Sequence, residues 1–168
     1  MKNGYYDESL SLVRNLSELA NLTAFFIYNR DDFDKWTQLE ESEAWKKYSP
    51  SKVRDKLKSL GKIDPIEKSH YSTLCSIGVH VTPKTKPGNY SLYETANIGS
   101  CFQEIGFLMC LNELGLMLGP IIMGVGKISN LPKNLKEIFV QLSVSIVEST
   151  GTITSQNYKQ IINDISKH

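Results

Sequence analysis

The chain lacks the sequence signatures of the common cofactor and nucleophile sites. It has no P-loop, no glycine-rich dinucleotide fingerprint and no nucleophile elbow. Its three cysteines and three histidines show no C-x-x-C or H-x-x-x-H spacing, so we expect neither a bound metal nor a cofactor. Cys75, Cys101 and Cys110 are odd in number and lie in apolar helical patterns. Free buried thiols in a reducing cytoplasm are therefore favoured over disulfides.

Signals for β-strands are also missing. No segment alternates apolar and polar residues over a sustained stretch, and the chain contains no hairpin turn pair and no internal repeat. With 40% hydrophobic and 22% charged residues, the 168-residue chain can bury a core as one domain. We predict an all-α fold in which residues 1–168 form an antiparallel helical bundle. A long central helix is buried, and a last short helix from about residue 153 is peripheral.

Neither a secretion signal nor a membrane span is expected. The opening residues, MKNGYYDESLSLVR, carry acids early and contain no uninterrupted apolar run. The run over 105–126 is long enough to cross a bilayer, but it contains Asn112, Glu113 and Pro120. A glutamate in the middle of a span is costly in lipid. We interpret this run as the central helix of a soluble cytoplasmic protein.

Apolar residues at helical intervals predict the first half of the bundle. Residues 5–29 form one long amphipathic helix, and a second follows over about 31–39. Ser49 caps a helix that Pro50 opens and Gly61 ends, and Asp64-Pro65 begins the next helix. The positions expected to face inward are Leu12, Val13, Leu16, Leu19, Ala20, Phe26 and Ile27 on the first helix and Val53, Leu57 and Leu60 on the helix after Pro50.

Two further helices are expected in the second half. The central helix runs from about Ser91 towards Leu118 and is interrupted at Gly119-Pro120. Another amphipathic helix opens at Asn130-Leu131-Pro132. Its inward positions are Leu135, Ile138, Phe139, Leu142 and Ile146.

Charge is distributed unevenly, although the formal net charge is only +1. Residues 1–45 carry nine acids and four bases, residues 46–86 carry ten bases and three acids, and the remainder is nearly balanced. This basic band could contact nucleic acid or the acidic front of the same chain. On the helix over 52–60 its spacing is that of an ordinary solvated face, and we favour this interpretation over a nucleic-acid footprint. Lys84 and Lys86, in the loop 83–88, are candidate anion-binding residues.

A polar cluster is the strongest candidate for a site. Arg14 and Glu18 share a stripe of the first helix among leucines, so they need partners from elsewhere in the fold. His80 follows Gly78, where an apolar helix ends. A carboxylate that orients a histidine beside an arginine can form a small chemical site, and the same three residues can form a closed structural network. Both interpretations stay open. His70 is interpreted as a surface residue.

Two segments carry a resemblance to a known family. LVRNLSE over 12–18 and YSTLCSIGVH over 71–80 resemble the HEPN-like helical proteins and neighbouring uncharacterised prokaryotic families. The resemblance covers about residues 5–90 and implies an antiparallel helical bundle that is often dimeric. In catalytic members it implies RNA cleavage in toxin or phage-defence systems. It places Arg14, Glu18, Tyr71 and His80 in one shared cluster.

The sequence departs from the nuclease members of that family at the catalytic motif. Their nuclease motif has an arginine a few residues before a histidine, whereas here the arginine nearest upstream of His80 is Arg54. We therefore expect a non-catalytic binding or regulatory module that forms a homodimer. The alternative is a divergent RNA- or nucleotide-processing enzyme that uses the Arg14, Glu18 and His80 cluster.

Overall fold

The computed structural model describes residues 5–78 and 102–149, which form helices and connections without strands. The all-α fold is confirmed. Helix boundaries in the described residues are α1 Tyr6–Tyr28, α2 Arg30–Trp36, α3 Glu41–Tyr48, α4 Pro50–Ser59, α5 Lys68–Gly78, α6 Glu104–Ile128 and α7 Lys133–Ser149. The predicted start of the central helix near Ser91 and the last helix from about 153 lie outside the described residues.

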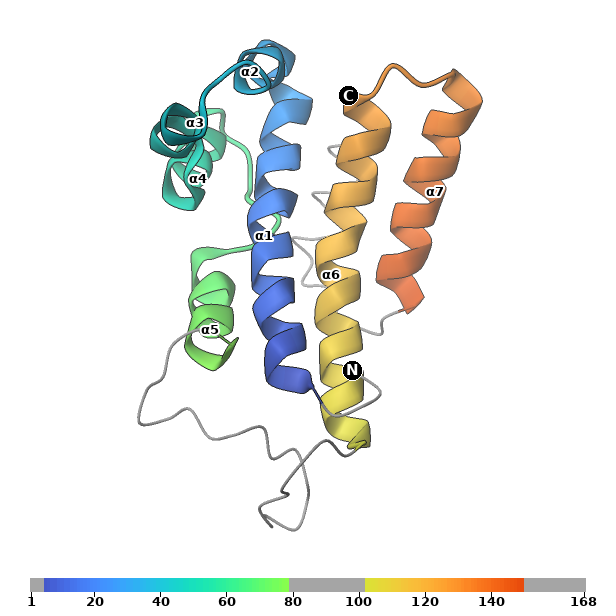
Figure 1. The fold of residues 1–168 in the computed structure, drawn as a ribbon. Helices are drawn as coiled ribbons and strands as arrows, with labels where there is room; N and C mark the ends of the chain where they lie inside the picture. The colour runs from blue at the N-terminus through green and yellow to red at the C-terminus, as the bar shows by residue number, and fades with distance from the viewer. Residues whose placement is uncertain (1–4, 79–101, 150–168) are drawn as a thin grey trace.

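The long helix α6 lies between α1 and α7, and the short helices lie on the far side of α1 (Figure 1). Tyr6 Oη accepts a hydrogen bond from the backbone N–H of Gln103 at 2.6 Å, and Thr23 lies against Gly124. Helices α1 and α6 therefore run in the same direction. Helix α7 runs antiparallel to α6, and α5 runs antiparallel to α1. The bundle with a long central helix is thus confirmed.

Two large apolar clusters form most of the core, one towards each end of α1, and a third, smaller cluster surrounds Met123 on α6. The first is built from α1, α5, α6 and the α4–α5 connection, and the second joins the C-terminal half of α1 to α2, α3, α4 and the end of α6. Their buried members are Tyr6, Leu10, Val13, Ala20, Ile66, Leu74, Cys110 and Met117 in the first and Phe25, Phe26, Val53, Leu57 and Ile128 in the second.

Helix α6 continues through Pro120, so the predicted interruption at Gly119-Pro120 is wrong. A proline inside a helix costs about 3 kcal/mol because it removes a backbone donor and crowds the preceding turn. Packing on both sides outweighs this cost. Ser143 on α7 is fully buried and donates its hydroxyl to the Gly119 carbonyl at 2.7 Å.

Helix α6 is long and apolar enough to cross a membrane, but the core helix of a soluble protein can have the same length and composition.

The connection between α4 and α5 also differs from the prediction. Gly61 ends α4 with a φ of 66°, a left-handed value that favours glycine. Asp64-Pro65 does not begin a helix, since α5 starts at Lys68. The buried Asn21 side chain binds both backbone groups of Ile66 and holds this segment in a non-helical path. Ser49 precedes α4 as predicted but makes no side-chain capping hydrogen bond.

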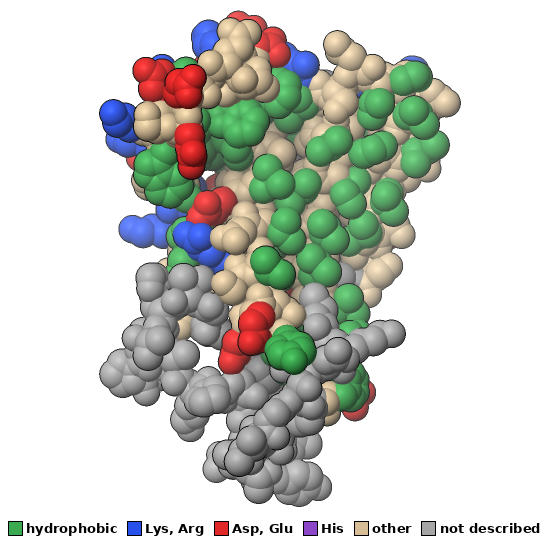
Figure 2. All heavy atoms as spheres, in the orientation of Figure 1, with side chains coloured by type: hydrophobic (Ala, Val, Ile, Leu, Met, Phe, Trp, Pro, Cys, Tyr) green, Lys and Arg blue, Asp and Glu red, His purple; other side chains and the backbone are tan. Residues whose placement is uncertain are grey.

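Several positions predicted to face inward are exposed. Leu12 is 65% exposed, and Ile138 and Leu142 are about half exposed at 52% and 48%. Leu60 and Leu19 are exposed as well. We call the exposed large apolar side chains of the three long helices the apolar face, which Figure 2 shows spread over α1, α6 and α7. Its members are Leu12, Leu19, Ile105, Leu108, Leu111, Val125, Leu135, Ile138 and Leu142.

Candidate functional site

The polar stripe of α1 meets α5 through Tyr71. The Arg14 guanidinium contacts Glu18 Oε1 at 2.7 Å through Nη2, and the Tyr71 hydroxyl donates to the same Oε1 at 2.8 Å. Arg14 Nη2 also lies 2.5 Å from the Tyr71 oxygen. The side chains of Arg14 and Glu18 are each 25% exposed. Three of the four residues expected in one cluster are therefore together, and we call Arg14, Glu18 and Tyr71 the polar cluster.

The surroundings raise the pKa values of Tyr71 and Arg14. Burial, reinforced by the hydrogen bond to Glu18, raises the pKa of Tyr71 to about 12. Burial alone would lower the pKa of Arg14, but the Cys75 side chain and the charge of Glu18 more than offset it, so that pKa is raised. At neutral pH the phenol therefore keeps its proton and the guanidinium keeps its charge. Neither group is suited to exchange a proton at that pH.

Arg54 belongs to the same assembly, which sequence reasoning missed by placing it on a solvated face. Its Cζ lies 5.1 Å from the Tyr71 ring centroid, and the Arg14 Cζ lies 5.2 Å from it. Within the described residues, Arg14 Nε and Arg54 Nη1 are buried nitrogens without a hydrogen-bond partner. Two cations thus share one tyrosine ring. The position of Arg54 next to the buried Val53 was the one sequence signal for this placement.

His70 is not simply a surface residue, so that prediction is wrong. Its Nε2 lies 2.7 Å from Glu113 Oε2, which joins α5 to α6. The side chains are 33% and 24% exposed. The hydrogen bond that protonated His70 donates to Glu113 raises the pKa of His70, although burial opposes this shift. The sequence offered no signal for this pair, because the two residues are forty-three positions apart.

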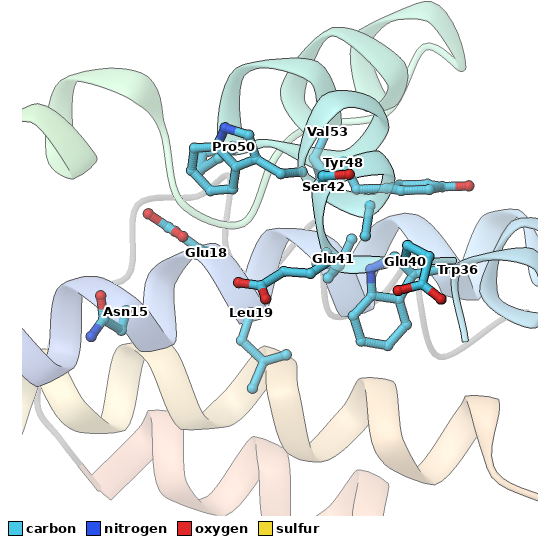
Figure 3. Close-up of a pocket in the computed structure, with 13 residues that line it drawn as sticks. Asn15, Glu18, Leu19, Trp36, Glu40, Glu41, Ser42, Tyr48, Pro50 and Val53 are labelled. Carbon is cyan, nitrogen blue, oxygen red and sulfur yellow. The ribbon is translucent and has the colours of Figure 1, made fainter. Parts of the chain in front are cut away.

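An open groove lies beside the polar cluster, between α1 and the helices α3 and α4 (Figure 3). Its volume is about 840 Å³. Trp36, Trp45 and Tyr48 line it, and Glu18 lies where the groove meets the polar cluster. We call this cavity the aromatic groove. The sequence analysis did not identify it, since it arises where three short helices fold back onto α1.

The remaining predicted site residues lie outside the described part of the chain. These are His80, Lys84 and Lys86. Within residues 5–78 and 102–149, no three His, Cys, Asp or Glu side chains gather in a way that could hold a metal ion. Cys75 and Cys110 are free thiols.

The described residues define an all-α helical bundle with a half-buried polar cluster on α1 and α5 and an aromatic groove beside it. Comparison with protein-family models, curated proteins and solved structures found no match to this chain. The case for a function therefore rests on its own residues.

Proposed function

We propose that this protein is a non-catalytic binding or regulatory module of the HEPN-like type. The observation that supports this proposal is the double use of Glu18 Oε1, which accepts from both Arg14 and Tyr71. The guanidinium of Arg14 and the phenol of Tyr71 thereby share one carboxylate oxygen, and both keep their protons at neutral pH because their pKa values are raised. Such a network stabilises the contact between α1 and α5. One carboxylate oxygen of Glu18 is thereby committed to contacts between helices.

The experiment pairs RNA cleavage with thermal unfolding. We expect the wild-type protein to leave single-stranded RNA intact, and His80→Ala to change mainly the melting temperature. Glu18→Ala should lower the melting temperature, because it leaves Arg14 partly buried without its counter-ion. Glu8→Ala, which removes an exposed carboxylate from the first turn of α1, serves as the control. Cleavage by the wild type that His80→Ala abolishes would refute the non-catalytic proposal. An unchanged melt in Glu18→Ala would refute the structural role of the polar cluster.

The second candidate is an RNA- or nucleotide-processing enzyme. The observation that favours it is the pair of guanidinium groups around Tyr71, each with a buried nitrogen that lacks a partner in the described residues. Guanidinium groups bind phosphate well, and here two of them lie against the same tyrosine ring. Arg54→Lys should weaken binding of a nucleotide on this view. An unchanged nucleotide affinity in this variant would refute a phosphate site at these two guanidinium groups.

We also propose a homodimer in the cytoplasm, with no membrane partner. The apolar face supports the dimer, since contiguous exposed apolar surface of this kind is rare on monomers. Of the 18 most apolar consecutive residues of α6, 39% are buried within one chain. The apolar face of a partner would cover much of the remainder. Free thiols at Cys75 and Cys110 suit a reducing compartment. Ile138→Asp should convert a dimer to a monomer in sedimentation velocity, whereas the exposed Glu137→Ala should not.

A further inference from the structure

The aromatic groove has the size and shape of a binding site for a small molecule. Its volume of about 840 Å³ falls within the range of ligand pockets, roughly 300–1,000 Å³. Leu19 and Leu22 of α1 form an apolar wall, and Pro50 and Val53 of α4 contribute from the opposite side. Such walls favour a ligand with an apolar body.

The groove is also lined by π-systems that can attract a cation. Trp36, Trp45 and Tyr48 line it. The Tyr48 ring already has Lys56 Nζ 4.4 Å from its centroid, whereas Trp45 is 62% exposed. The negative face of an aromatic ring attracts ammonium groups, and tryptophan does so most strongly. The chain has two tryptophans and both lie here. An exposed indole beside a cavity therefore offers a ready surface for a positively charged ligand.

The charges of the lining point to the same ligand class. Glu18, Glu40 and Glu41 line the groove, whereas none of its described lining residues is a lysine or arginine. Figure 3 shows Glu18 and Glu41 directed into the space between α1 and α3, with Glu40 beside Trp36. Arg14 partly neutralises Glu18. Glu40 and Glu41 are exposed and form no ion pair within the described residues, so they are available to a cation.

We propose that the aromatic groove binds a small organic cation, an alkyl- or arylammonium compound. Its ammonium group lies near the indoles and the carboxylates of Glu40 and Glu41, and its apolar body packs against Leu19 and Leu22. The inference rests on the proposed binding function and adds the chemical class of the ligand. The carboxylates disfavour an anion in this groove, and they attract a cation more strongly than a neutral ligand.

The test uses the intrinsic fluorescence of the two tryptophans, which reports on this site directly. Benzyltrimethylammonium is titrated into the full-length protein, with benzyl alcohol as the neutral probe and benzenesulfonate as the anionic probe. We expect a saturable change in emission with the cation alone. Glu41→Gln should weaken its binding by about threefold to tenfold. Glu43→Gln is the matched control, because Glu43 lies on the same helix but does not line the groove, and it should leave the affinity unchanged.

Equal responses to all three probes, or no saturable response to the cation, would overturn the inference. So would equal loss of affinity in Glu41→Gln and Glu43→Gln, which would indicate only a diffuse effect of charge. Saturable binding of a lysine-rich peptide without binding of the ammonium probe would also overturn it and would identify the groove as a peptide site. RNA cleavage dependent on His80 would instead refute the proposed non-catalytic function, so the two failures are distinguishable.

Discussion

Removing the amide of Asn21 should destabilise the protein more than any exposed substitution on α1. Asn21 is 3% exposed, and its Nδ2 donates to the Ile66 carbonyl at 2.9 Å. The Ile66 N–H donates back to Asn21 Oδ1 at 2.8 Å. Ile66 lies in the connection between α4 and α5, so its backbone groups lack the regular partners that a helix provides. Asn21→Ala removes both bonds at once.

The expected loss follows from these two bonds. Each net hydrogen bond contributes about 1 kcal/mol, and a buried backbone group left without a partner costs about 1–3 kcal/mol. These terms overlap, and alanine regains about 0.5 kcal/mol of helix propensity. We therefore expect the free energy of unfolding to fall by about 2–4 kcal/mol. A domain with about 5–15 kcal/mol of stability would remain folded at low temperature.

Urea denaturation gives the global change, and hydrogen exchange at the Ile66 amide gives the local one. The control is Asn15→Ala, which removes an exposed amide from the same helix and should change stability by less than about 0.5 kcal/mol. The Ile66 amide should lose protection in Asn21→Ala and keep it in the control. Equal stability of the two variants, or unchanged protection at Ile66, would refute the assignment of Asn21 as the anchor of this segment.

Three further predictions concern helix packing, a turn and pH. Gly124→Ala should lower stability by about 1–2 kcal/mol in urea denaturation, because the new Cβ would lie 2.6 Å from Thr23 Cβ. This overpacking outweighs a helix-propensity gain of about 1 kcal/mol. A more stable variant would contradict this prediction. Gly61→Ala should cost about 1 kcal/mol by the same assay, since its φ of 66° is unfavourable for a side chain, and an unchanged urea midpoint would show that the turn relaxes. The raised pKa of His70 means that its bond to Glu113 stabilises the fold fully below the ordinary histidine value of about 6.5 and is lost as pH rises through the folded value. The urea midpoint of the wild type should therefore exceed that of His70→Gln by more at about pH 5.5 than at about pH 9. The change in this stability difference between the two pH values should be at most about 1 kcal/mol, because the pair is partly exposed. A difference that does not depend on pH would refute the coupling.

Much of the fold could be predicted from local patterns. The spacing of apolar residues identified α1 within a residue or two, and Pro50 and Gly61 marked the ends of α4. Two of the four cluster residues, Arg14 and Glu18, are neighbours on one helix face, so their meeting follows from helical geometry alone. Tyr71 came from the family resemblance. Its hydrogen bond to Glu18 could not be derived from spacing.

Other features required knowledge of which helices pack together. The apolar spacing of α7 indicated a helix correctly but did not indicate that Ile138 and Leu142 would remain exposed. The same limitation applies to Pro120, which is a helix breaker by propensity and lies inside α6 because α1 and α7 support it. His70 meets Glu113 across two helices, and no local pattern encodes that contact.

The sequence by itself determined that the chain is helical, where most of its helices run, and that Arg14 and Glu18 are paired. These properties depend on residues within four positions of each other, so they follow from the 3.6-residue period and from backbone preferences. The tertiary structure alone decided which faces are covered, which carboxylates line the aromatic groove, and that Asn21 anchors Ile66. Those outcomes depend on contacts between distant segments, whose free energy outweighs local propensity wherever the two disagree.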